Sequence, residues 1–386
     1  MPSQFCKCYL PVKNIEPQDA SPYNKMDVDR KAGFSKKLLG WYAVHHRKLP
    51  WRETHDPYKI WISEVMLQQT TVLVVIPYYK KWLSQFPDIE TLSAAPLQQV
   101  LKVWQGLGYY QRAKNLHRSA RILLDEYKGK IPENYEELIK LPGFGPYTTA
   151  AVLSIAYDKS FPVIDANVRR VWMRIMGLTK ESTPKVDKEI QKHMEPFIPS
   201  AKMGTFNQAV MELGSLVCKP KNPLCLLCPV EEYCKAFALG EQEIIPRPQR
   251  RSYRKIEAVI GVIEKGGKYL IQKRPSTGLL SDLWEFPGGK KRKDETLEHA
   301  LRREIKEELA TEIDGIEFLT EVKHAYTQFQ VKLHAFKCQL KRDPSLSKDG
   351  HRWVSLRGMR KYPFPSGSAK IVQFLEQREK EAKGTS

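Results

Sequence analysis

The sequence predicts an α+β protein of several domains, in which an all-helical domain is followed by a mixed α/β domain. Two observations predict this order. Apolar residues recur at spacings of three and four through most of residues 33–240, as on the buried faces of helices. Residues 256–338 instead hold alternating, strand-like runs around one charged helix. A chain of 386 residues is long enough for two or three separate cores.

The first and last stretches complete this division. Residues 1–30 show no clear period and are expected to form a loose extension. Residues 241–255 contain prolines and a basic run, which predicts a linker before a second domain at 256–380.

Charge indicates the kind of partner. The chain has 63 Lys and Arg against 44 Asp and Glu, a formal net charge of +19, which favours a polyanion such as nucleic acid. A merely basic, solvated surface is the alternative. The sequence contains no run of about 18 apolar residues, so it predicts no membrane span. Its first residues also lack the apolar stretch of a secretory signal. We therefore expect a cytoplasmic protein, associated with the nucleoid if it is bacterial.

The most informative stretch runs from Leu141 to Asn167. It begins with a Pro-Gly-x-Gly turn in which Gly143 and Gly145 permit positive φ, and a helix follows at 147–157. Amide groups exposed at such a helix start favour a DNA phosphate. An ordinary helix–turn–helix corner is the alternative reading. A single acid, Asp165, precedes the next helix at 168–176.

A second acid stands in unusual surroundings. Glu64 lies within the apolar helical run IWISEVML, where a carboxylate must be exposed, paired, or raised in pKa. Most helical glutamates are exposed, which is the alternative. The preceding loop mixes cations with aromatic rings, and its Trp51 and Arg52 suit bases and phosphates.

Two further patterns carry chemistry. The turn at 106–110, Gly-Leu-Gly-Tyr-Tyr, fits either a wedge for a base stack or a helix C-cap beside packed tyrosines. Four cysteines follow a spacing of six, two and five residues, which suits a 4Fe–4S cluster, with zinc as the alternative. These four are Cys218, Cys225, Cys228 and Cys234.

The cysteine spacing, the LPGFG hairpin followed by an acid, and the run SEVMLQQT together resemble the adenine DNA glycosylases of the MutY type. These belong to the helix-hairpin-helix, endonuclease III-like superfamily. The resemblance is close over residues 33–240. It implies a glycosylase domain at 31–240 whose loop at 218–234 holds a 4Fe–4S cluster. Lyases of the superfamily carry Lys where Tyr147 stands here, so the resemblance implies an enzyme without lyase activity.

The resemblance also implies roles for individual residues. Glu64 would protonate N7 of adenine and later activate water, while Asp165 would stay ionised, with its pKa lowered by the helix N-terminus, and stabilise the sugar cation. Tyr147 and Asn167 would orient this pair. Gln69, Leu107 and Tyr109 would fill and wedge the base stack after adenine is flipped out. The residues expected to contact DNA are Trp51, Arg52, Gln69, Leu107, Tyr109, Gly143, Gly145, Tyr326, Thr327 and Gln328.

The second domain resembles a Nudix fold. Gly289, Glu295 and the run at 303–308 match most of the Nudix signature, whereas Ala310 and Thr311 depart from it. In the resembled family such a domain reads 8-oxoguanine through a Phe-Ser-His loop, for which residues 326–328 stand here. A surviving magnesium site on the glutamates of 304–308, with nucleotide hydrolysis, is the alternative to a scaffold.

The resemblance implies a monomeric enzyme that excises adenine opposite 8-oxoguanine or guanine in double-stranded DNA and starts base excision repair. A DNA-binding module without catalysis is a rival reading. Glu64 and Asp165 discriminate the two, because binding alone needs neither acid.

Overall fold

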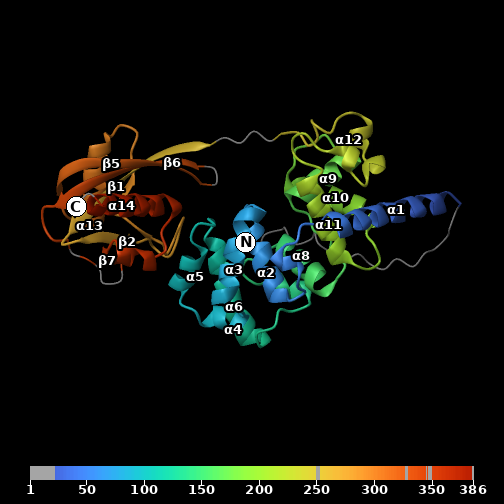
Figure 1. The fold of residues 1–386 in the computed structure, drawn as a ribbon, viewed down its shortest axis with the longest axis horizontal. Coiled ribbons are helices and arrows are strands. Elements are labelled where there is room, and N and C mark those ends of the chain that lie inside the picture. The colour runs from blue at the N-terminus through green and yellow to red at the C-terminus, as the bar shows by residue number, and fades with distance from the viewer. Residues whose placement is uncertain (1–21, 249–252, 327–328, 345, 347–349, 385–386) are drawn as a thin grey trace. The chain divides into compact units, whose positions relative to one another are not determined.

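The protein is described here from a computed structural model, which covers residues 22–248, 253–326, 329–344, 346 and 350–384. The chain divides into two compact units. We call residues 1–93 and 118–250 the helical unit, and residues 94–117 and 251–386 the sheet unit. Figure 1 shows their helices and strands, and each unit is described by itself below. None of the helices in the described ranges is both long and apolar enough to cross a membrane.

The helical unit is built from helices joined by short turns (Figure 1). Its helices are α1 (Pro22–His45), α2 (Pro57–Leu67), α3 (Val72–Gln85), α4 (Ile89–Ala94), α7 (Tyr135–Leu138), α8 (Pro146–Tyr157), α9 (Ala166–Met176), α10 (Asp187–Met194), α11 (Met203–Leu216) and α12 (Lys235–Ala238), with the 3₁₀ turns η1 (Pro50–Arg52), η2 (Pro184–Val186), η3 (Glu195–Phe197), η4 (Cys225–Leu227) and η5 (Glu231–Tyr233). Helix α6 (Gln111–Tyr127) begins in the sheet unit and ends in this one.

Local signals explain where the central helices begin. Asp56 caps α2 by accepting from the backbone N–H of Tyr58, and Pro57 occupies the first helical position. The helices predicted at 147–157 and 168–176 are confirmed as α8 and α9. The apolar residues of α9, with those of α1, α10 and α11, form a continuous core around Trp172 and Phe206.

Two boundaries differ from the sequence-based expectation. Helix α1 begins at Pro22, inside the stretch expected to be loose, because proline is compatible with the first turn of a helix. In the expected linker, Ile245 is 1% exposed and belongs to the core of the helical unit. Its carbonyl accepts from the guanidinium of Arg174, so the chain leaves this unit only after Ile245.

The sheet unit has one mixed sheet, in which seven strands are described. The strands are β1 (Arg254–Lys265), β2 (Lys268–Lys273), β3 (Trp284–Glu285), β4 (Gly288–Lys290), β5 (Ile313–Tyr326), β6 (Phe329–Leu340) and β7 (His351–Ser355), and the helices are α5 (Leu97–Trp104), α13 (Leu297–Leu309), α14 (Ser366–Gly384) and the 3₁₀ turn η6 (Arg357–Lys361). The order is β3-β2-β1-β6-β5, with β4 added to β1 and β7 to β2. Strands β1 and β6 are parallel, while the other pairs are antiparallel.

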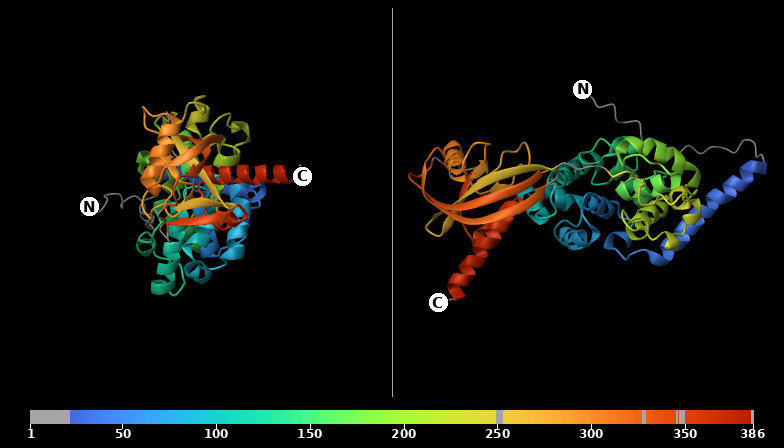
Figure 2. Two further views of the ribbon diagram at one scale, coloured as in Figure 1. Left: turned by 90° about the vertical axis from the view of Figure 1, so that its left-hand side faces the viewer. Right: turned by 90° about the horizontal axis from the view of Figure 1, so that it is seen from above.

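Strand β1 divides the core of this unit into two layers. Its successive side chains point to opposite faces of the sheet. Ile260 and Val262 join a cluster with α14, whereas Val259 and Ile263 join another with α13. The two helices therefore cover opposite faces of a sheet whose twist is visible in Figure 2. Helix α13 is the charged helix predicted among these strands.

Candidate active site and cysteine loop

Glu64 is buried in the middle of α2. It is 4% exposed, and the hydroxyl of Tyr147 donates to its Oε2 at 2.7 Å. Burial, with a smaller contribution from the negative charge of Asp165, raises the pKa of Glu64 to about 7, although the Tyr147 hydrogen bond and Arg52 oppose the shift. The raised pKa expected for a carboxylate in this apolar helix is therefore found. Glu64 can hold a proton near neutral pH and give it to a base.

The hairpin before α8 places Tyr147 against Glu64. Phe144, at the tip of the hairpin, stacks on Trp61 of α2, with ring centroids 5.0 Å apart. Gly143 has φ 83°, a conformation that favours glycine, whereas Gly145 has φ −77° and does not need that freedom. The stacked pair fixes the start of α8 beside α2, and Tyr147 follows directly.

Asp165 is the N-cap of α9. Its Oδ1 accepts from the backbone N–H of Val168 at 2.7 Å, and its Oδ2 accepts from the Asn167 amide at 3.3 Å. The sequence predicts that the helix N-terminus lowers the pKa of Asp165, and this direction is wrong. Burial raises the pKa of the carboxyl, and the hydrogen bonds and Arg170 only oppose that effect. The dipole of a helix is a smaller effect than removal of a charge from water.

Two glycines let α11 lie close to both α8 and α9. A Cβ on Gly204 would lie 2.4 Å from the backbone oxygen of Ser154 in α8. A Cβ on Gly214 would lie 2.8 Å from the Cβ of Asn167 in α9. Between these positions Met211 brings its sulfur within 3.8 Å of the Tyr147 hydroxyl. Helix α11 therefore forms a close support behind the two acids and the residues that orient them.

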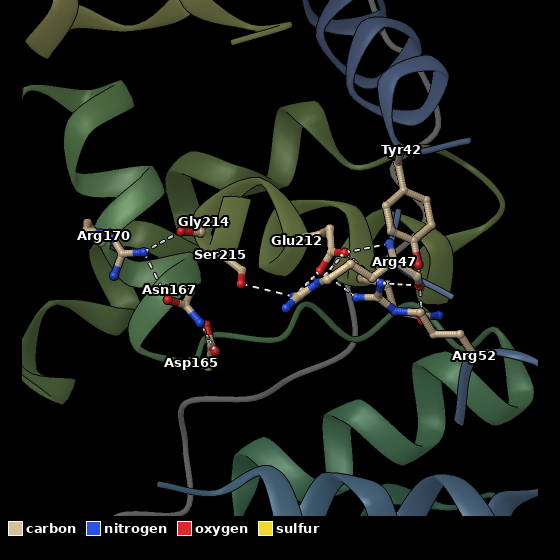
Figure 3. A network of polar contacts seen from close by, with 10 residues as sticks. Tyr42, Arg47, Arg52, Asp165, Asn167, Arg170, Glu212, Gly214 and Ser215 are labelled. Carbon is tan, nitrogen blue, oxygen red and sulfur yellow. Dashed lines mark hydrogen bonds and ion pairs between the residues drawn. The ribbon is translucent and has the colours of Figure 1, made fainter. Parts of the chain in front are cut away.

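Arg170 fixes the side chain of Asn167, as Figure 3 shows. Its guanidinium donates to Asn167 Oδ1 at 2.9 Å, to the Gly214 carbonyl at 2.7 Å and to the Cys218 carbonyl at 2.9 Å. With its oxygen held in this way, the amide group of Asn167 is turned toward Asp165. Sequence reasoning missed Arg170, although two arginines one turn apart on an apolar helix are a usable signal.

The second arginine, Arg174, binds the start of the cysteine loop. It is 2% exposed and donates to the carbonyls of Lys219 and Pro220 and to the sulfur of Cys218 at 3.2 Å. The thiols of Cys218, Cys225, Cys228 and Cys234 are free and partly buried. Burial, with smaller contributions from the neighbouring cysteines, raises the pKa of the Cys228 thiol to about 12. Among the described residues, no three His, Cys, Asp or Glu side chains are grouped to hold a metal ion.

Glu212 joins α11 to the segment between α1 and α2 (Figure 3). Its side chain is fully buried and accepts from both Arg47 and Arg52, whose contacts hold its pKa at about 2 against the effect of burial. Arg52 is thereby paired inside the protein, and Trp51 is 6% exposed against Tyr79. Trp51 and Arg52 make these internal contacts, and their expected contacts with DNA stay a prediction. Glu212 itself was missed, although it stands in an apolar helix as Glu64 does.

The other residues expected at DNA have different environments. Gln69 is exposed and has φ 56°, which is uncommon for a residue with a side chain. In the sheet unit, Tyr109 is partly exposed with φ 48°, while Leu107 is 6% exposed and lies largely inside. Tyr326 ends β5, and Thr327 and Gln328 lie outside the described residues. The expectation that residues 326–328 read the damaged base therefore stays a prediction.

The glutamates of α13 are held by neighbours. Glu304 accepts from Arg303 at 2.8 Å, and Glu307 from Arg292 and Arg303 at 3.2 Å. Glu308 accepts from the backbone N–H of Gly288 at 2.8 Å. The Gly288 contact joins the start of β4 to α13. The scaffold role and the alternative magnesium site both stay predictions.

Two family models match this chain. Residues 62–196 match the HhH-GPD superfamily of base excision DNA repair proteins, and residues 258–374 match the NUDIX domain. The adenine DNA glycosylase of Buchnera aphidicola subsp. Schizaphis graminum is 39% identical over 259 residues, which is 66% of this chain and 74% of that protein. The human adenine DNA glycosylase is 32% identical over 389 residues, covering 85% of this chain and 71% of that protein.

A solved structure and one further relative complete the comparison. The structure of a thermostable thymine-DNA glycosylase superposes with a TM-score of 0.51 at 30% identity, covering 57% of this chain and 100% of that one. The adenine DNA glycosylase of Buchnera aphidicola subsp. Acyrthosiphon pisum is 33% identical over 348 residues, 88% of this chain and 97% of that protein. The chain therefore belongs to the adenine DNA glycosylase family and is a DNA glycosylase, a hydrolase of N-glycosyl bonds.

Proposed function

We propose that this enzyme flips adenine out of duplex DNA where it is paired with 8-oxoguanine or guanine, and releases it by hydrolysis without cutting the strand. The observation that carries the proposal is the buried Glu64, whose pKa of about 7 keeps it available as an acid beside Tyr147. A purely DNA-binding protein has no use for such a group, and burying it without a function lowers stability.

In the first step Glu64 gives its proton to N7 of the flipped adenine. The bond between C1′ of the sugar and N9 of the base then breaks, and its electron pair leaves with adenine. Protonation makes the base a better leaving group, as in other cleavages of glycosidic bonds. Tyr147 donates to Oε2 of Glu64 and so fixes the rotamer of the acid.

In the second step the sugar carries a positive charge that Asp165 stabilises. The hydrogen bonds from Val168 and Asn167 favour the carboxylate form and fix its position. Water then attacks C1′ and gives a proton to the Glu64 carboxylate, which restores the acid. Hydrolysis leaves an abasic site and free adenine, because the position of the lyase amine is held by Tyr147.

The base opposite adenine is read by other parts of the chain. The exposed Gln69, with its left-handed backbone, suits insertion into the gap left by the flipped base. Tyr109 and Leu107 act as the wedge, and residues 326–328 contact the damaged guanine. Because an amide stands at position 328 in place of the usual His, we expect a smaller preference for 8-oxoguanine over guanine than in relatives.

We further propose that the four cysteines hold a 4Fe–4S cluster. Four free thiols on one loop are the donor set of such a cluster, and the guanidinium of Arg174 beside Cys218 suits a thiolate. When bound, the cluster supplies structural support to the loop, and the exposed Lys219 and Lys221 contact phosphates. Cys225→Ser should weaken DNA binding more than it slows base release. Stoichiometric zinc without iron in anaerobically prepared protein would contradict the cluster.

The decisive experiment measures single-turnover adenine release from duplexes with adenine opposite 8-oxoguanine. Glu64→Gln should lower the rate by more than the roughly 10²–10⁴ typical of one general acid, with duplex affinity nearly unchanged. Glu53→Gln, at an exposed position, is the matched control. Wild-type turnover in Glu64→Gln would remove Glu64 from the mechanism. Efficient borohydride trapping by the wild-type protein would contradict hydrolysis without lyase activity.

A further inference from the structure

Residues 94–117 are bound to the C-terminal part of the chain within the sheet unit. The centre of this contact is an ion pair. The ammonium of Lys114 donates to Asp282 Oδ2 and to Ser281 Oγ, both at 2.6 Å. The Lys114 and Asp282 side chains are only 10% and 14% exposed, and Lys273 lies 3.7 Å from the other Asp282 oxygen. Removing one partner of such a shielded ion pair costs much free energy, because water cannot easily reach and solvate the charge that remains.

Helix α5 adds further contacts between residues 94–117 and the C-terminal part of the chain. The Gln98 amide donates to the Asp282 carbonyl at 2.9 Å, and its oxygen accepts from the Trp284 indole at 3.0 Å. Lys102 donates to the Tyr362 carbonyl at 2.9 Å. Together with the ion pair, these contacts form what we call the dock, made by Gln98, Lys102 and Lys114 on one side and residues 281–284 and 362–364 on the other.

The turn at 106–110 lies between the anchored residues of the dock. The Tyr110 hydroxyl donates to the Phe364 carbonyl at 3.0 Å, which joins the turn itself to the C-terminal part. The Trp104 indole donates to the Gly108 carbonyl at 2.9 Å. The guanidinium of Arg112 donates to the carbonyls of Leu107 and Gly108, both at 3.2 Å.

Tyr109 needs this support. Its φ of 48° is left-handed, a conformation that is unfavourable for a residue with a side chain. The Arg112 guanidinium lies 5.5 Å from the Tyr109 ring centroid and 5.1 Å from that of Trp104, so the ring is backed by a cation. A strained turn persists only where its surroundings fix it, and here the dock supplies part of those surroundings.

We propose that the C-terminal domain sets the position of the Tyr109 wedge through the dock, with Asp282 and Lys114 as positioning residues for base flipping. The domain then acts on catalysis in two separable ways, by contacting the base opposite adenine and by holding the wedge. This inference rests on the proposed function of Tyr109. The contact of the dock with the turn, however, is a property of the sheet unit alone.

Asp282→Asn tests the dock. Asp282 has φ 64°, and asparagine tolerates that backbone, so the variant removes the charge with little change in shape. Lys114→Met removes the partner charge and keeps a long stem. Asp343→Asn is the matched control, because its ion pair with Lys265 is also 2.6 Å long but exposed.

Two measurements are made on each variant of the full-length protein. Hydrogen exchange should speed up in peptides covering 104–112 in both dock variants and stay unchanged in Asp343→Asn. With 2-aminopurine opposite 8-oxoguanine, the flipped population should fall roughly three- to thirtyfold. Release of an adenine that is already unpaired, in a bulge, should keep the wild-type rate. The double variant Lys114→Met, Asp282→Asn should be no worse than the more affected single variant.

Unchanged exchange at 104–112 in both single variants would overturn the dock as a support of the turn. Faster exchange with normal flipping would overturn the positioning role. An equal loss on paired and bulged adenine would also contradict it, since the effect would then lie in the chemical step. Absence of adenine release from the wild-type protein would instead refute the proposed function, while the exchange result would still stand.

Discussion

Burial of Glu64 has two effects, one on the protonation state of its carboxyl group and one on the stability of the folded protein. With the pKa of Glu64 at about 7, its acid form predominates below that pH and is lost above it. If the acid form is required, the single-turnover rate should be level below about pH 7 and fall about tenfold per pH unit above it. A rate that stays constant up to pH 9 would contradict protonation of the base by Glu64.

The same shift has a consequence for folding. Because the folded pKa of Glu64 lies above the value of 4.5 expected when unfolded, its contribution is most favourable below pH 4.5 and is lost as the pH rises through about 7. In Glu64→Gln this loss disappears. The difference in Tm between the variant and the wild type should therefore increase between pH 4.5 and 7 and become constant above.

Ala310 shows strain at a single residue. It caps α13 with φ 52°, the left-handed conformation for which the Nudix signature has glycine. Ala310→Gly should therefore stabilise the sheet unit by about 1 kcal/mol, measured by urea unfolding. Ala300→Gly, in the middle of the same helix, should destabilise it by at least about 1 kcal/mol. A destabilising Ala310→Gly would show that strain at this cap is offset by contacts of the methyl group.

At the scale of elements, the approach of α11 to α9 positions Asn167. Gly214→Ala would place a methyl group 2.8 Å from the Cβ of Asn167 and 3.3 Å from its backbone, so one helix must move. We expect adenine release to slow roughly ten- to a hundredfold, because small displacements at a reacting centre are costly. Gly40→Ala is the control, since its Cβ would meet nothing within 4 Å in α1. Release at the wild-type rate in Gly214→Ala would mean that the position of Asn167 is unimportant.

At the scale of the whole molecule, the C-terminal domain that begins at Ile256 and the rest of the chain have different predicted tasks. A chain ending before Ile256 should still release adenine, but its preference for 8-oxoguanine over guanine opposite adenine should narrow. It also loses the dock, so flipping should be impaired on both duplexes. Comparison with Asp282→Asn separates the two losses, because that variant keeps the whole domain. An unchanged ratio of rates on the two duplexes would show that the C-terminal domain does not read the base.

The sequence by itself determined the order of elements and predicted which residues would carry chemistry. Helices α8, α9 and α13 follow from local signals such as apolar period, proline and capping side chains, which act over a few residues. The cysteine spacing and the acid within an apolar helix are also local patterns. For Glu64 the local pattern was sufficient to predict burial and a raised pKa. The reason is that α2 is apolar on nearly every side and must be buried whatever packs against it.

Only the tertiary structure decided the surroundings of the remaining residues. Arg52 pairs with Glu212 from a helix far along the chain, and the pKa of Asp165 is raised, not lowered, because packing removes it from water. The turn at 106–110 groups with the C-terminal domain through Lys114 and Asp282, two residues with no shared motif. Burial and long-range pairing depend on which elements meet, and a local pattern contains no information about that choice.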